Sequence, residues 1–144
     1  MTALGLAPLA AFRGTLQVDG YAGFGSLARK DASIRLAFCW AHARRPFYEF
    51  YTSTQSPLAA EVLARIARLN EIEADIRGQP PDGRQAVRQL RSRPLVEELH
   101  IWLQDHVPRV PGWSDLAIAM RYALRHWDGL ILYSTMGAWR WTPM

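Results

Sequence analysis

One acidic side chain in the sequence stands where catalytic and metal-binding carboxylates are often placed. Asp19 follows the β-prone run 15–18 and directly precedes Gly20. A carboxylate at the end of a strand, just before a glycine turn, is expected to be exposed at a sheet edge, where a metal or a substrate can reach it. The alternative is an ordinary turn, because aspartate and glycine are both common turn residues. Asp19 is therefore a candidate catalytic and metal-binding residue with a structural alternative.

A second strand-like run, 34–40, contains a thiol near its end and is followed by an imidazole and two guanidinium groups. Cys39 and His42 form a Cys-x-x-His pair, and Arg44 and Arg45 follow. Such a pair supplies two of the four ligands of a structural zinc ion. A zinc or cysteine-centred enzyme would therefore need further ligands that the sequence does not obviously supply. The alternatives are a small buried thiol, a histidine bonded to a backbone carbonyl, and a solvated helix start for the arginines.

Three further arginines have helical spacing. Arg84, Arg88 and Arg91 stand at positions i, i+4 and i+7, so a helix would align them as a stripe. Like charges at this spacing repel by a few tenths of a kcal/mol per pair, and a bound anion would relieve that repulsion. The stripe, together with Arg44 and Arg45, is a candidate surface for DNA phosphates. The alternative is a solvated helix face.

The composition fits one globular domain with a basic surface. The chain has 144 residues, of which 49% are hydrophobic and 21% charged, and its formal net charge is +4. Lys30 is the only lysine among 17 basic residues. Arginine binds phosphate through two parallel hydrogen bonds, so an arginine-rich chain favours a nucleic-acid partner. A GC-rich coding sequence would produce the same bias, so charge alone does not decide between them.

Several classes of protein are not favoured by the sequence. No apolar run approaches the ~20 residues of a membrane span, and residues 1–12 lack the basic start of a signal peptide. The single cysteine, Cys39, is compatible with a reducing compartment. We expect a cytoplasmic protein with no membrane partner.

The elements expected to position these side chains change character along the chain. Residues 1–13 are interpreted as a loose lead-in. Strands are predicted at 15–19 and 34–39, with a short helix near 24–31 between them. A helix is then predicted from Ala41 to about residue 52, and no strand is expected after it.

The remaining sequence has a helical pattern. Ser56 is a suitable N-cap before Pro57, and Gly78 marks the end of that helix. A second helical region is predicted over 81–106, with Pro94 expected to kink or divide it. After a linker at 108–112, a last helix is predicted to begin at Ser114. The apolar residues of the first of these helices recur every three or four positions, which places them on one face: Leu58, Val62, Ile66, Leu69, Ile72 and Ile76.

Several of these motifs, in this order and spacing, resemble the central domain of the insertion-sequence-66-type transposases. The similarity covers roughly residues 8–130, and Pro46 departs from it, because the family usually has a basic residue there. The motifs that carry the resemblance are Leu16-Gln17-Val18-Asp19-Gly20-Tyr21-Ala22-Gly23-Phe24, Cys39-Trp40-Ala41-His42-Ala43-Arg44-Arg45-x-Phe47, Ser56-Pro57-Leu58-Ala59-Ala60, Ile72-Glu73-Ala74, Arg91-Ser92-Arg93-Pro94, Ser114-Asp115-Leu116-Ala117, Arg121-Tyr122-Ala123-Leu124 and Trp127-Asp128.

The resemblance implies a fold and an activity. The family is similar to ribonuclease-H-like DDE enzymes, which cut and join DNA with three carboxylates and divalent metal such as Mg²⁺. The implied fold class is a mostly helical α/β fragment, with two short strands of a ribonuclease-H-like sheet followed by an all-helical region. Asp19 would be the second of the three acids. The resemblance places the first and third outside these 144 residues, so weak or no Mg²⁺ binding and no DNA cleavage are expected.

The sequence thus predicts three segments: a lead-in at 1–13, a partial transposase central domain at 14–130, and a tail at 131–144. The tail loses the helical period, and a shifted reading frame of its codons resembles the segment ahead of the family's third acid, so we interpret it as the product of a frameshift. The expected partners are transposon-end DNA, in which case the protein would be nucleoid-associated, and another copy of the chain or an intact transposase. The alternative function is a non-catalytic DNA-binding or oligomerising module that modulates an intact transposase.

Overall fold

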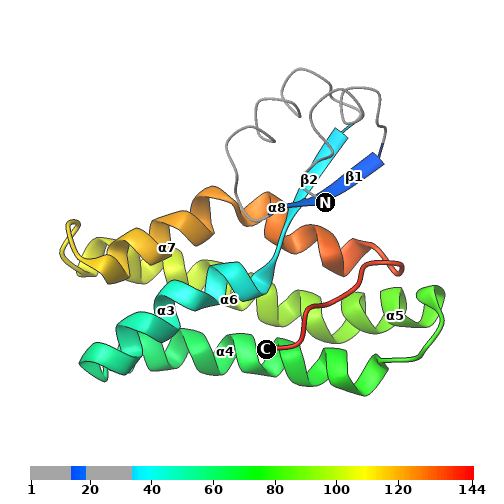
Figure 1. Ribbon diagram of the computed structural model, residues 1–144, viewed down its shortest axis with the longest axis horizontal. Coiled ribbons are helices and arrows are strands. Elements are labelled where there is room, and N and C mark those ends of the chain that lie inside the picture. The colour runs from blue at the N-terminus through cyan, green and yellow to red at the C-terminus, as the bar shows by residue number, and fades with distance from the viewer. Residues whose placement is uncertain (1–13, 19–33) are drawn as a thin grey trace, which may run out of the picture.

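The computed structural model describes the backbone of residues 14–18 and 34–144, and the side chains from Cys39 onward. Strand β1, Gly14–Val18, pairs in parallel with strand β2, Ile34–Phe38, and Gly14 lies opposite Ile34. Figure 1 shows this pair projecting from one side of a body of helices. The short helix predicted near 24–31 and the candidate residue Asp19 lie outside the described residues.

The helices follow β2 without a further strand in the described residues. Figure 1 shows the four longest of them lying along the length of the molecule. In chain order the helical elements are α3 (Trp40–Thr54), α4 (Pro57–Ile76), α5 (Pro81–Val87), the π-helix η2 (Arg88–Ser92), α6 (Arg93–His106), the short 3₁₀ turn η3 (Val107–Arg109), α7 (Asp115–Arg125), α8 (Trp127–Ile131) and the 3₁₀ turn η4 (Leu132–Thr135).

The ends of α4 and the start of α7 confirm the predicted helix signals. The Ser56 side chain accepts a hydrogen bond from the backbone N–H of Ala59, 3.3 Å away, directly before α4. Ser114 caps α7 in the same way, through a 3.1 Å bond from Ala117. Gly78 follows α4 with a φ of +90°, a conformation that glycine adopts without the strain imposed by a side chain.

The helical run 81–106 is divided ahead of Pro94, as predicted, and the division is a widened turn. Pro94 has no N–H, and its ring crowds the carbonyl four residues earlier, so the regular i→i−4 pattern cannot continue through it. The backbone responds with the π-helix η2, in which the N–H of Arg93 bonds to the carbonyl of Arg88, five residues earlier. Both Arg88 and Ser92 are buried within this widened turn.

One hydrophobic core joins the helices to the C-terminal segment. Trp40, at the start of α3, donates its indole N–H to the carbonyl of Leu130 at 3.0 Å. Its ring meets the rings of Trp127 and Tyr133 edge to face, with centroids 5.6 and 6.5 Å apart. Residues from both ends of the helical region therefore share one core.

The predicted fold class is wrong. The part of the structure with described side chains, residues 39–144, is helical and contains no strand, and no ribonuclease-H-like sheet is seen in the described residues. The backbone pairing of β1 with β2 is a single two-stranded ladder. Single-sequence patterns identify where a strand is locally favoured, but they do not determine whether several strands assemble into a sheet.

Candidate nucleic-acid interface

The start of α3 positions two of the predicted site residues. Cys39 precedes the helix in an extended conformation, and its carbonyl accepts backbone hydrogen bonds from His42 and Ala43, both at 3.2 Å. Its thiol is half-buried, and the His42 ring is exposed one turn along the helix. The backbone of Cys39 thus begins α3.

The predicted arginine pair lies further along the same helix. Arg45 is exposed, whereas Arg44 is half-buried with its guanidinium carbon 5.0 Å from the centre of the Tyr48 ring. Both arginines line a shallow hollow of about 410 Å³ that also includes Met144 of the C-terminal segment. Stacking on Tyr48 holds the cation of Arg44 near the surface.

The predicted stripe 84/88/91 does not form one continuous surface. Arg88 is only 1% exposed, and its guanidinium makes two parallel bonds to the Glu73 carboxylate, at 2.9 and 2.8 Å. The π-helix places Arg88 inward, against α4. Arg88 is therefore not accessible to a phosphate in this structure, because both its charge and its donors are used inside the protein.

The other two stripe residues are accessible but differ in their surroundings. Arg91 is exposed and reaches Asp75 Oδ2 at 3.4 Å through both terminal nitrogens. Arg84 is half-buried and donates to two backbone carbonyls, that of Gly137 at 2.8 Å and that of Gln79 at 2.6 Å. In the described part of the chain no carboxylate pairs with Arg84.

One face of the α5–η2 run binds the backbone of the C-terminal segment. Four side chains at positions i, i+1, i+4 and i+5 share that face, and each donates to a carbonyl of residues 133–139. Arg88 reaches the carbonyls of Met136 at 2.6 Å and Trp139 at 2.9 Å. The remaining donors of this face are Arg84 to Gly137, Gln85 to Thr135 at 3.2 Å, and Gln89 to Ser134.

The tail is fixed at two further points. The indole N–H of Trp141 donates to Asn70 Oδ1 at 2.9 Å, and the backbone N–H of Met144 reaches the same oxygen at 3.3 Å. Tyr133 is 1% exposed, and burial raises the pKa of its phenol well above the ordinary value, so the group is neutral at physiological pH. Residues 133–144 thus pack against α4 and the α5–η2 run.

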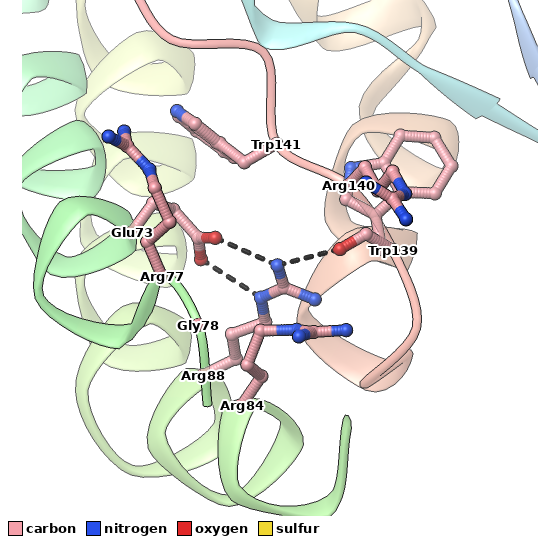
Figure 2. Close-up of a pocket in the computed structure, with 8 residues that line it drawn as sticks. All are labelled: Glu73, Arg77, Gly78, Arg84, Arg88, Trp139, Arg140 and Trp141. Carbon is pink, nitrogen blue, oxygen red and sulfur yellow. Dashed lines mark hydrogen bonds and ion pairs between the residues drawn. The ribbon is translucent and has the colours of Figure 1, made fainter. Parts of the chain in front are cut away.

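A pocket of about 370 Å³ lies between the tail, the end of α4 and the α5–η2 run. Figure 2 shows Arg84 and Arg88 rising from one side of it, Glu73 and Arg77 on a second side, and Trp139 and Arg140 on the third. Sequence reasoning missed Arg77 and the tail residues Arg140, Trp139 and Trp141. It missed the three tail residues because it treated the tail as foreign to the domain. The available signal was the segment Trp139-Arg140-Trp141, a cation between two indoles.

A comparison with known families identifies the chain. The family described as Transposase IS66 family matches residues 3–142, which include the predicted motifs and most of the tail. The chain belongs to the IS66 transposase family.

Three relatives of this IS66-family chain are longer proteins of Sinorhizobium fredii. One, described as uncharacterized protein y4jD, is 45% identical over 127 residues, covering 85% of the chain and 25% of the relative. Uncharacterized proteins y4qI and y4hP are each 36% identical, covering 90% and 87% of the chain and 25% of each relative. The chain therefore spans about a quarter of the length of these curated relatives. No solved structure matches it.

The described residues of this IS66-family chain do not fit the divalent metal that its family implies. Within residues 39–144 no three His, Cys, Asp or Glu side chains lie together as a metal site would require. The thiol of Cys39 and the imidazole of His42 are softer ligands than Mg²⁺ prefers. None of the described helices is both long and apolar enough to span a bilayer.

Proposed function

We propose that this chain is part of a DDE transposase that acts in DNA transposition, and that its helical region contacts DNA without itself cutting it. The family match over residues 3–142 carries the proposal. The side chains that would contact phosphate are the accessible arginines of the predicted set, Arg44, Arg45, Arg84 and Arg91. Arg88 is left out, because its guanidinium is bonded inside the protein.

The catalytic part of the proposal rests on Asp19, which lies outside the described residues. By resemblance to the family motif, Asp19 is one of three acids, and the other two have no counterpart in these 144 residues. A lone carboxylate rarely makes a Mg²⁺ site, because Mg²⁺ gives up its water reluctantly. The 144-residue chain alone should therefore neither nick nor join DNA.

A cleavage assay tests this expected lack of activity directly. The purified chain is incubated with labelled transposon-end duplex and Mg²⁺ or Mn²⁺, and the products are separated on a denaturing gel. We expect no product above a metal-free control. Metal-dependent cleavage that disappears in Asp19→Asn would contradict the proposal of a silent chain.

DNA contact has a separate test, because phosphate binding releases counterions. Four phosphate contacts, one for each of these arginines, would give a log–log salt slope of about −3.6, so the affinity for duplex DNA should fall about 150-fold between 50 and 200 mM salt. Arg45→Gln with Arg91→Gln should flatten the slope by about two. Arg125→Gln, an exposed arginine outside the proposed set, is the control. Binding that does not change with salt would contradict the proposed contacts.

The alternative, an oligomerising module that modulates an intact transposase, is favoured by large apolar side chains left on the surface. Trp113 is 83% exposed and lines a hollow of about 540 Å³ together with Val110 and Leu116. Such residues often mark protein–protein contacts when they gather into a patch. Light scattering would show a mass above that of one chain, and Trp113→Ser should return it to that of a monomer.

A further inference from the structure

The pocket beside the tail has an excess of positive charge. Four arginines and one glutamate line it. The charge of Glu73 is neutralised by Arg88, which leaves Arg77, Arg84 and Arg140 as three positive charges. In the described part of the chain none of these three pairs with a carboxylate. Three cations gathered around one hollow repel each other, and a bound anion would relieve that repulsion.

The buried ion pair makes this pocket a built site. Arg88 and Glu73 have side chains only 1% and 3% exposed, and their carboxylate–guanidinium bonds fix the pocket floor. Arg88 also holds the carbonyl of Trp139 at 2.9 Å, directly before Arg140. The cation of the tail is therefore presented to the pocket by a rigid support.

The pocket also has aromatic walls. Trp139 and Trp141 flank Arg140, and both are half-buried, so part of each indole remains accessible. The indole N–H of Trp141 is fixed by Asn70. Indole faces stack on nucleobases of any sequence, and guanidinium groups bind phosphate through parallel N–H bonds. The combination suits a ligand with a phosphate and a flat ring.

We propose that this pocket binds one unpaired nucleotide of a nucleic-acid strand, with Arg77, Arg84 and Arg140 at its phosphate and a tail indole against its base. The volume of about 370 Å³ lies at the lower end of the range of small-ligand sites, and it has no room for a duplex. Arg84 keeps free donors for this role, because its two hydrogen bonds to backbone carbonyls use only Nε and Nη1 of a group with five N–H donors. The inference deepens the proposed DNA contact, on which it rests, by naming single-stranded DNA as the ligand of this site.

Fluorescence anisotropy with a labelled eight-nucleotide oligo-dT strand tests the site. Arg77→Gln with Arg140→Gln should weaken binding at least tenfold, and both residues are exposed, so the fold should tolerate the change. The matched control is Arg68→Gln with Arg125→Gln, which removes the same charge from exposed positions outside the pocket. We expect the control to weaken binding twofold or less. Equal losses in the two variants would overturn the proposal, because binding would then depend on net charge alone.

Two further arms identify the ligand and separate this inference from the proposed function. Thymidine 5′-monophosphate should compete with the strand at lower concentration than inorganic phosphate; equal competition would overturn the role of the indoles. Arg77→Gln with Arg140→Gln should leave duplex binding within twofold. If that variant keeps single-strand binding while duplex binding is normal, the pocket assignment fails and the DNA contact stands. If the unmodified chain binds neither strand nor duplex, both fail.

Discussion

Two ion pairs join the same two segments of the molecule, and they differ in almost every other respect. Glu73 of α4 meets Arg88 at 2.8 Å with side chains 3% and 1% exposed. Two residues further along α4, Asp75 meets Arg91 at 3.4 Å with side chains 63% and 47% exposed. Side chains two positions apart on a helix point in nearly opposite directions. A shift of two positions thus separates an internal support from a surface contact.

The comparison teaches that arginines with the same sequence signature can have opposite roles. Arg88 and Arg91 both belong to the predicted stripe, yet only Arg91 is accessible to a phosphate. Charged groups are buried in proteins when they are paired and fully hydrogen-bonded. Arg88 meets this condition because Glu73 and the tail carbonyls together accept its donors.

The largest effect is expected from removing the buried cation. Arg88→Ala leaves the Glu73 carboxylate buried without a partner and takes the donors from the tail carbonyls. Breaking a buried pair in this way typically costs about 3–5 kcal/mol of unfolding free energy. Urea unfolding followed by circular dichroism measures it, and Arg91→Ala is the matched control. Equal destabilisation by the two variants would remove the distinction between the pairs.

A smaller loss is expected when the shape of the buried partner is kept and its charge is removed. Glu73→Gln retains one carbonyl acceptor for Arg88 but loses the charge-assisted bonds, which are worth about 1.5–3 kcal/mol. The same urea experiment applies, with Asp75→Asn as the control. A Glu73→Gln protein as stable as the unmodified chain would show that the carbonyls alone satisfy Arg88.

A change in the tail tests how closely the tail docks against α5, and the urea experiment measures it. A Cβ built on Gly137 would lie 1.9 Å from the carbonyl oxygen of Pro81, so Gly137→Ala must push the tail away from α5. Overpacking of this kind costs about 1–3 kcal/mol. Gly112→Ala is the control, because its nearest neighbour would be an arginine side-chain nitrogen 4.0 Å away. Equal stability of the two alanine variants would contradict close docking of the tail.

The smallest effect is expected at the exposed pair. Arg91→Gln should change the unfolding free energy by about 0.2–1 kcal/mol, because solvent and salt screen the pair. The same variant should weaken duplex DNA binding at low salt. A large loss of stability without a change in DNA binding would make Arg91 a structural residue. The exposed pair would then not differ in role from the buried pair.

The helices could be predicted from sequence, since their signals are local. Ser56 and Ser114 are N-caps, and the apolar positions of α4 lie on one buried face, apart from the half-buried Leu58. The burial of Arg88 could not be predicted in this way. It depends on Glu73, fifteen residues away, and on carbonyls about fifty residues away.

The sequence was least informative about the sheet and the tail. The two strand-prone runs gave a two-stranded ladder and no ribonuclease-H-like sheet in the described residues. The frameshift interpretation of 131–144 stays a prediction. Because these residues lack a helical period, their sequence did not indicate that they pack against the helices. Residues 133–139 offer backbone carbonyls to α5 and η2, and a carbonyl carries no side-chain signature that sequence reasoning could detect.

The measurement that tests the account most directly is a pair of double-mutant cycles on unfolding free energy, one for each ion pair. One cycle combines Glu73→Gln with Arg88→Gln, and the other combines Asp75→Asn with Arg91→Gln. Coupling energies between contacting residues run from about 0.5 to 3 kcal/mol. We predict about 2 kcal/mol or more for the buried pair and less than about 0.5 kcal/mol for the exposed pair. Equal coupling in the two cycles would contradict the division of the arginine stripe into an internal support and a surface contact.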